Sequence, residues 1–168
     1  MGMVALVVWA IDGGPVLLRQ RRVGKDGRVF GVAKFRTLRI DASNGKFVSE
    51  RELGAYATKL GRVLRRCRLD ELPQLWNVIV GEMSLVGPRP ELPWIVARYA
   101  ARHRRRLYAK PGLTGIWQVM SPRSKPIHEE MKFDLYYLRR ASLWLDVKLL
   151  LVTLGFLAWP SMTVKRGR

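Results

Sequence analysis

The chain has 168 residues, about the length of one domain, so a single packed core is expected with no room for a second large one. Its 31 lysines and arginines against 13 aspartates and glutamates give a formal net charge of +18, which predicts an anionic partner: nucleic acid, a phosphorylated small molecule or membrane headgroups. The single cysteine, Cys67, excludes an intramolecular disulfide, and two histidines are too few to suggest a zinc cluster of cysteine and histidine.

Two apolar segments bear on membrane association. Residues 3–11 are apolar, but no basic residue precedes them and Asp12 follows at once, so they do not resemble a cleavable signal peptide. Both this segment and the second, residues 149–160, are shorter than the roughly 20 residues of a spanning helix. The sequence therefore predicts contact with a membrane surface at most.

A β-hairpin is predicted near the N-terminus. Residues 16–23 and 28–38 have strand character, and the connection between them carries an Asp-Gly turn signal. On the second strand Lys34 and Arg36 are two residues apart and share a face, while Phe35 points to the other face. Two neighbouring cations suit a phosphate, and a solvated strand face is the alternative.

The middle of the chain predicts a loop followed by two helices. Residues 41–59 are polar and without periodicity, which is typical of a loop that borders a site. Residues 57–66 predict a short basic helix. A second helix is predicted from Asp70 to about Gly81, with Pro73 in its first turn, where a missing N–H is tolerated.

Asp70 and Glu71 are adjacent carboxylates that follow the four arginines at positions 62, 65, 66 and 68. An aspartate before a helix is well explained as an N-cap, and a glutamate in the first turn complements the helix dipole. Alternatively, an ionised carboxylate among cations can attack a phosphorus atom whose negative charge those cations neutralise. From these residues alone, both roles stay open.

Arg89 lies between Pro88 and Pro90, each of which restricts the preceding residue to extended geometry. A guanidinium on such a stiff segment can bind two phosphate oxygens at once, which lysine cannot do. A surface arginine in an extended loop is the alternative.

A helix is predicted over residues 91–108, and a final helical region over residues 126–159 that is broken near Ser142. The first ends in an arginine cluster at residues 102–106, which the helix dipole stabilises. This cluster resembles interfacial membrane anchoring when it is combined with the tryptophans Trp94, Trp117, Trp144 and Trp159. Nucleic acid is not an expected partner, because the sequence has none of the usual nucleic-acid-binding motifs.

Five blocks of sequence occur in an order that is specific to one family. They are GPV with QRRVG within residues 14–24, KFRT at 34–37, LDELPQLWNV at 69–78, GEMSLVGPRP at 81–90 and KPGLTGIWQV at 110–119. In these blocks the chain resembles the bacterial sugar transferases, also called monotopic phosphoglycosyl transferases. The predicted elements and this resemblance together imply an α+β fold: a mostly helical single domain with a small β-hairpin, associated with a membrane surface.

The resemblance implies an enzyme that transfers a sugar-1-phosphate from a UDP-sugar to polyprenyl (undecaprenyl) phosphate, releases UMP and starts exopolysaccharide, capsule or related glycan synthesis. It implies a sugar transferase domain over residues 14–168, with residues 1–13 as the remnant of a membrane-associated helix. The chain is therefore expected to be N-terminally short. The cytoplasmic face of the bacterial inner membrane, with its anionic lipids, is the implied location.

The resemblance also implies roles for single residues. Asp70 is the implied nucleophile, which forms a phosphosugar intermediate, and Glu71 is its partner. Mg²⁺ is the implied cofactor, held at Asp70 and bridging the diphosphate. The implied phosphate-binding cations are Lys34, Arg65 and Arg89, to which the strand pattern adds Arg36. The competing interpretation is a truncated, catalytically silent basic module that binds anionic lipid or nucleic acid.

Overall fold

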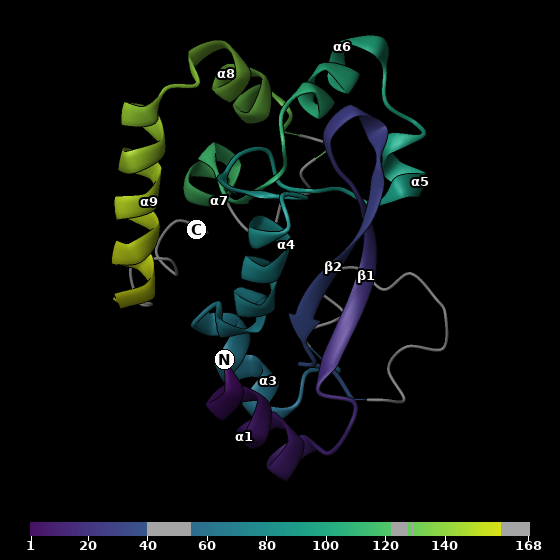
Figure 1. Ribbon diagram of the computed structural model, residues 1–168, viewed down its shortest axis with the longest axis vertical. Coiled ribbons are helices and arrows are strands. Elements are labelled where there is room, and N and C mark those ends of the chain that lie inside the picture. Colours follow the sequence, from purple (N-terminus) through teal and green to yellow (C-terminus); the bar gives the residue numbers. More distant parts are fainter. Residues whose placement is uncertain (40–54, 122–127, 129, 159–168) are drawn as a thin grey trace. The chain divides into compact units, whose positions relative to one another are not determined.

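The computed structural model describes residues 1–39, 55–121, 128 and 130–158, so most of the predicted loop at 41–59 lies outside the described residues. The chain forms two compact units, each built from two separate stretches of sequence. The first comprises Met1–Arg19 and Ala33–Gln74, and the second comprises Gln20–Val32 and Leu75–Arg168. Helices predominate beside two small sheets (Figure 1), which confirms the predicted α+β class.

The predicted β-hairpin is present. Strands β1 (Leu17–Val23) and β2 (Val29–Phe35) pair with each other through a short 3₁₀ turn, η1 (Lys25–Gly27). Asp26 and Gly27 have φ angles of 55° and 80°, a left-handed conformation that aspartate and glycine tolerate better than most residues. The Asp-Gly pair therefore sets the turn. The base of the hairpin belongs to the first unit and its tip to the second.

In the first unit, helix α3 (Lys59–Arg66) begins at a well-made cap. The Thr58 hydroxyl accepts a hydrogen bond from Gly61 N at 2.8 Å and donates one to Asp12 Oδ2 at 2.7 Å, at the end of helix α1 (Gly2–Asp12). A Cβ atom at Gly61 would lie 2.1 Å from Thr37 O, so only glycine allows this approach of α3 to the chain after β2. The predicted helix at 57–66 is thus confirmed.

Thr58→Ala is expected to lower the free energy of unfolding by about 1–2 kcal/mol, because it removes the cap of α3 and the donor to Asp12. Urea denaturation followed by circular dichroism measures this change. Thr58→Ser is the matched control, since it keeps the hydroxyl and should retain most of the stability. A serine variant as unstable as the alanine variant would contradict the capping role.

The helix predicted from Asp70 to Gly81 forms as two shorter pieces. A 3₁₀ segment, η3 (Leu69–Gln74), contains Pro73 and leads into α4 (Leu75–Ile79), and Gly81 follows with a φ of 81°. Asp70 is the second residue of η3 rather than the residue before a helix. The N-cap interpretation therefore does not fit its position.

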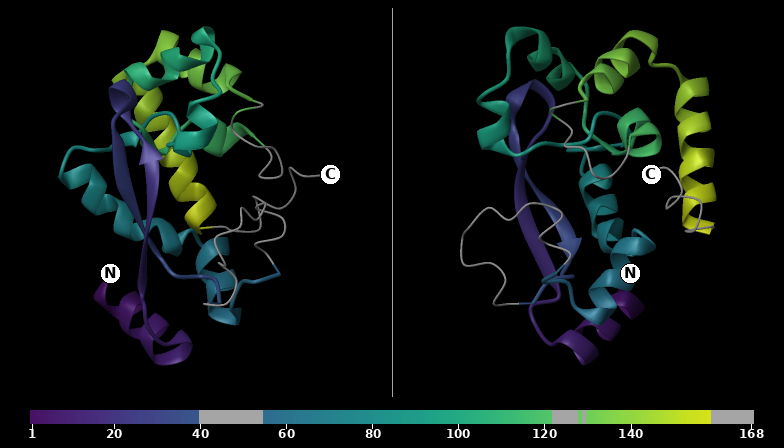
Figure 2. Two further views of the ribbon diagram at one scale, coloured as in Figure 1. Left: turned by 90° about the vertical axis from the view of Figure 1, so that its right-hand side faces the viewer. Right: turned by 180° about the vertical axis from the view of Figure 1, so that it is seen from behind.

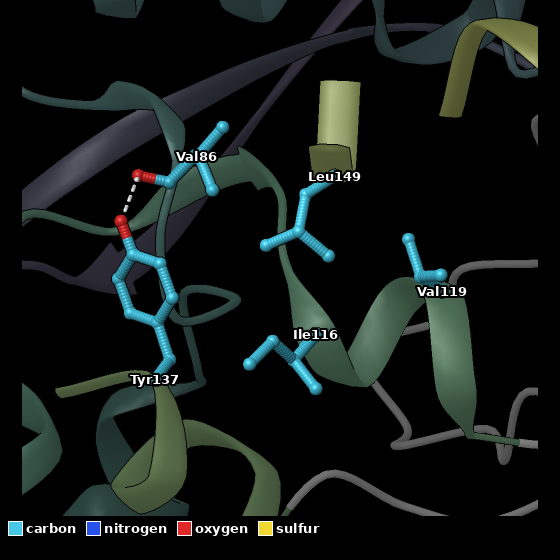
Figure 3. Packing of buried hydrophobic residues seen from close by; sticks show 5 residues of the cluster. All are labelled: Val86, Ile116, Val119, Tyr137 and Leu149. Atoms are coloured by element: carbon cyan, nitrogen blue, oxygen red, sulfur yellow. Dashed lines mark hydrogen bonds between the residues drawn. The ribbon is translucent and has the colours of Figure 1, made fainter. Parts of the chain in front are cut away.

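The second unit is built around a pair of parallel strands, β3 (Ser84–Val86) and β4 (Gly112–Thr114). Helix α9 (Leu143–Ala158) contacts both strands and α7 (Ile116–Met120). Figures 1 and 2 show the yellow α9 beside the green α7. The buried core of this unit joins five side chains from these elements and from α8 (Lys132–Arg140), drawn in Figure 3: Val86, Ile116, Val119, Tyr137 and Leu149.

The prediction of a single helix over residues 91–108 is wrong. The chain forms three short pieces instead: α5 (Pro93–Val96), α6 (Ala101–Arg104) and a 3₁₀ segment, η4 (Arg105–Tyr108). Glu91 forms a bridge with Val23 in extended geometry, and Pro93 starts the first helix. Ala100, with ψ of 155°, interrupts the helical path before α6.

The final helical region is broken as predicted, because α8 ends at Arg140 and α9 begins at Leu143. Trp94 and Trp144 are exposed, but Trp117 is buried, so it is not a membrane anchor as its pattern suggested. Trp159 lies outside the described residues. Within the described part of the chain, no helix combines the length and the apolar character that crossing a bilayer requires.

Candidate active site

In the first unit, the structure brings Lys34 to the paired carboxylates. The Lys34 Nζ atom, near the end of β2, lies 3.4 Å from Glu71 Oε1 on η3, although the two residues are 37 positions apart. Asp70, beside Glu71, is 9% exposed. Two residues that were predicted from separate sequence blocks are therefore in direct contact.

The backbone that leads from α3 into η3 determines where Arg65 lies. It lies in the last turn of α3, and Arg68 then turns the chain into η3 with a φ of 56°. Arg68 N donates to Arg65 O, and Glu71 N donates to Arg68 O, both at 3.3 Å. These bonds fix the path from Arg65 to the two carboxylates, and the Arg65 side chain is partly exposed.

Arg36 does not take the place predicted for it. Its side chain is buried, and its guanidinium donates to the backbone carbonyls of Gly14 (2.9 Å), Gly13 (2.6 Å) and Asp12, where α1 ends. Both terminal nitrogens are used in these bonds. The geometry therefore supports a structural role for Arg36 at the end of α1 rather than the predicted role as a phosphate ligand.

Asp70 and Glu71 fit the way proteins usually hold Mg²⁺. This ion prefers oxygen ligands and is commonly bound by one or two carboxylates, with substrate phosphates and water completing the shell. Asp70 and Glu71, which follow one another on η3, would each offer one such oxygen. No group of three or more histidine, cysteine, aspartate or glutamate side chains that could hold a metal occurs among the described residues.

In the second unit, the segment that carries Arg89 is held through its backbone. Each carbonyl oxygen of residues 88–91 accepts a hydrogen bond from a residue elsewhere in the unit. In order from Pro88 to Glu91, the donors are Gly112 N (2.8 Å), Arg106 Nη2 (2.6 Å), Arg22 Nη1 (3.3 Å) and Val23 N (2.9 Å). Pro88 and Pro90 are buried and Arg89 between them is partly exposed. The stiffness predicted from the two prolines is thus reinforced from outside the segment.

Arg106 is 2% exposed, which corrects its assignment to a solvated helix end. Its guanidinium lies 2.5 Å from Asp134 Oδ2 and donates to Tyr99 Oη at 2.6 Å. Burial lowers the pKa of Arg106, but Asp134 and Tyr99 together outweigh it, so the net direction is upward. Burial also raises the pKa of Asp134, against the opposing effect of Arg106, and raises the pKa of Tyr99 to about 12.

Sequence reasoning missed this buried cluster. Arg106 is one of three consecutive arginines, and nothing local distinguishes it from its two exposed neighbours. One usable signal was Asp134, a carboxylate between Phe133 and Leu135 in a helical region, because a buried aspartate requires a cationic partner.

The family described as "Bacterial sugar transferase" matches residues 1–159 of the chain. The chain belongs to this family. The resemblance drawn from the five sequence blocks is thereby confirmed, and the candidate residues of both units lie inside the matched region of this sugar transferase.

Curated relatives of this sugar transferase are longer proteins. "Galactosyl transferase CpsE" of Streptococcus agalactiae is 39% identical, over 85% of this chain and 34% of the relative. A "UDP-glucose:undecaprenyl-phosphate glucose-1-phosphate transferase" of Xanthomonas campestris is 38% identical, over 89% of this chain and 33% of the relative. "Undecaprenyl-phosphate galactose phosphotransferase" of Salmonella typhimurium is 35% identical, over 84% and 33%. The chain thus spans about a third of the length of these relatives.

Proposed function

We propose that this sugar transferase moves a sugar-1-phosphate from a UDP-sugar to polyprenyl (undecaprenyl) phosphate, releases UMP and starts exopolysaccharide, capsule or related glycan synthesis. The observation that carries the proposal is the contact of Lys34 with Glu71 beside the buried Asp70. A cation bound to the carboxylate that follows Asp70 in the chain supports the proposal, because phosphoryl transfer to a carboxylate is favoured by nearby positive charge. The names of the relatives, which include UDP-glucose and undecaprenyl phosphate, support the substrate classes.

The proposed reaction has two displacements at one phosphorus atom. A carboxylate oxygen of Asp70 attacks the phosphorus that bears the sugar, and the bond from this phosphorus to UMP breaks, so that UMP leaves with the electron pair. An oxygen of polyprenyl phosphate then attacks the same phosphorus and releases the Asp70 carboxylate. UMP is a stable anion and needs no strong general acid, so the scheme requires no histidine.

The cations and Glu71 have separate tasks in this scheme. Lys34 and Arg65 neutralise charge that would repel an attacking carboxylate, and Arg89 binds two phosphate oxygens in one plane. Glu71 orients Lys34, which it contacts at 3.4 Å, and supplies a second oxygen ligand beside Asp70. When bound, Mg²⁺ supplies further neutralisation of the diphosphate.

We also propose that the protein acts at the cytoplasmic face of the bacterial inner membrane. Helix α9 exposes Leu143 (82%) and Trp144 (66%), and Lys148 Nζ lies 5.0 Å from the centre of the Trp144 ring. Helix α1 separately exposes Met3 and Trp9. Tryptophan, lysine and exposed apolar side chains on one helix suit the boundary between headgroups and acyl chains.

The test is a UMP-release assay on the full chain in lipid nanodiscs that contain polyprenyl phosphate, with Mg²⁺ and a panel of UDP-sugars. We expect UMP from at least one donor, and a matching lipid-linked sugar product. Absence of UMP with every donor, together with salt-sensitive binding to DNA or anionic vesicles, would overturn the proposal and favour a silent basic module.

Chelation of divalent cations with EDTA is expected to reduce UMP release by roughly 100-fold or more, because the ion neutralises charge on the diphosphate. Added Mg²⁺ should restore the rate. Binding of the protein to nanodiscs, measured by co-sedimentation, is the control and should not change. Full activity after chelation would contradict the proposed cofactor.

A further inference from the structure

The backbone around Arg89 depends on donors from elsewhere in the second unit. Pro88 and Pro90 have no N–H, so this segment is fixed mainly through its carbonyl oxygens. The carbonyl of Arg89 itself accepts from Arg106 Nη2 at 2.6 Å. Among the four donors to residues 88–91, this one acts directly on the residue whose side chain is the proposed phosphate ligand.

An arginine at position 106 is not explained by stability alone. A buried ion pair is often no more stabilising than apolar residues of the same volume, because two charges must leave water. Arg106 and Asp134 are both 2% exposed and so carry that cost. What an apolar pair could not supply is the planar donor group, which bonds Tyr99 Oη with one terminal nitrogen and Arg89 O with the other.

Asp134 and Tyr99 in turn fix the Arg106 guanidinium. Asp134 Oδ2 lies 2.5 Å from Nη2, and Tyr99 Oη accepts from Nη1 at 2.6 Å. The phenol stays protonated and neutral well above physiological pH, since burial raises the pKa of Tyr99 to about 12. The plane of the guanidinium, and with it the donor to Arg89, is therefore held by two partners from separate parts of the chain.

We propose that Arg106, fixed by Asp134 and Tyr99, is a positioning residue that aligns Arg89 for phosphate. This inference rests on the proposed function, because it assigns Arg106 a part in binding the UDP-sugar diphosphate through Arg89. The Arg106 side chain itself is too buried to contact a substrate directly.

A double-mutant cycle between Arg106→Lys and Arg89→Ala tests this proposal. Arg106→Lys keeps the positive charge beside Asp134 but loses the planar fork, and we expect kcat/KM for UMP release to fall about 10-fold. Arg89→Ala alone should lower it roughly 100-fold. If Arg106 acts through Arg89, the double variant should fall no further than Arg89→Ala. Multiplying effects would overturn the proposal.

The matched control is Val119→Ala, a core variant in the same unit that lies outside the Arg106 hydrogen bonds. Whatever loss of kcat/KM Val119→Ala causes should multiply with the loss caused by Arg89→Ala, as expected for independent sites. Tyr99→Phe provides a milder variant should Arg106→Lys fail to fold. It removes only the hydroxyl, and its expected loss of about 2- to 5-fold should likewise vanish in the Arg89→Ala background.

UDP binding measured by calorimetry is the second readout, and the same cycle is expected in Kd. If the wild type is active but the losses of Arg106→Lys and Arg89→Ala multiply in the double variant, only the role of Arg106 is overturned. A wild type that neither releases UMP nor binds UDP overturns the proposed function and this inference together.

Discussion

Asp70→Asn is expected to abolish the exchange of labelled UMP into UDP-sugar, with a fall of roughly 10⁴-fold or more. The amide has nearly the same size as the carboxylate but no anionic oxygen with which to attack phosphorus. Asp70 is only 9% exposed, and because the amide is nearly isosteric with the carboxylate, the packing around it should stay intact. The assay contains no polyprenyl phosphate, and the exchange therefore reports the first displacement alone.

Asp26→Asn is the matched control for this substitution. Asp26 is exposed in the turn of the hairpin with a φ of 55°, a conformation that asparagine tolerates well. Its exchange rate should equal that of the wild type. Exchange by Asp70→Asn within about 10-fold of the wild type would contradict Asp70 as the nucleophile. Absence of exchange in the wild type would contradict the covalent intermediate, because direct transfer to the lipid phosphate gives no exchange without that lipid.

The elements that sequence reasoning predicted well are those whose signals are local. The hairpin follows from an Asp-Gly turn between two strand-like stretches, and the left-handed φ angles at Asp26 and Gly27 show why those residues are needed. The break near Ser142 and the short helix at 57–66 were also readable, since helical periodicity and its interruption lie within a few residues.

The features that were missed depend on backbone carbonyls far away in the sequence. Arg36 bonds to carbonyls 22 to 24 positions earlier, and Arg106 bonds to the carbonyl of Arg89, 17 positions earlier. Every residue has a carbonyl oxygen, so such an acceptor leaves no trace in the sequence. Both arginines were therefore assigned to solvated faces or phosphate from their local pattern, when they in fact hold main chain in place.

The two proline- and glycine-containing blocks, at residues 81–90 and 110–119, are partners in space. Ser84 pairs with Gly112 and Val86 with Thr114 in the parallel β3–β4 pair. Gly112 N then donates to Pro88 O at 2.8 Å, which continues the contact into the segment of Arg89. These two blocks of the family resemblance thus meet in one close backbone contact, which supports the segment of the proposed phosphate ligand.

Gly112→Ala is expected to lower the free energy of unfolding by about 3 kcal/mol or more, as a severe clash in a packed region does. An added Cβ would lie 2.1 Å from Gly87 N and 2.4 Å from Thr114 O, and both are backbone atoms that cannot move without breaking the strand pair. For a chain of this size, that loss lowers the melting temperature by roughly 6–12 °C. Differential scanning fluorimetry measures the change.

Gly155→Ala is the matched control, because nothing lies within 4 Å of a Cβ atom built at this position in α9. It should raise the free energy of unfolding by about 0.5–1 kcal/mol, since alanine favours the helix over glycine. A Gly112→Ala protein that melts with the wild type would contradict the close β3–β4 contact. Where the variant stays folded, its kcat/KM should also fall, because the donor to Pro88 moves and Arg89 loses part of its support.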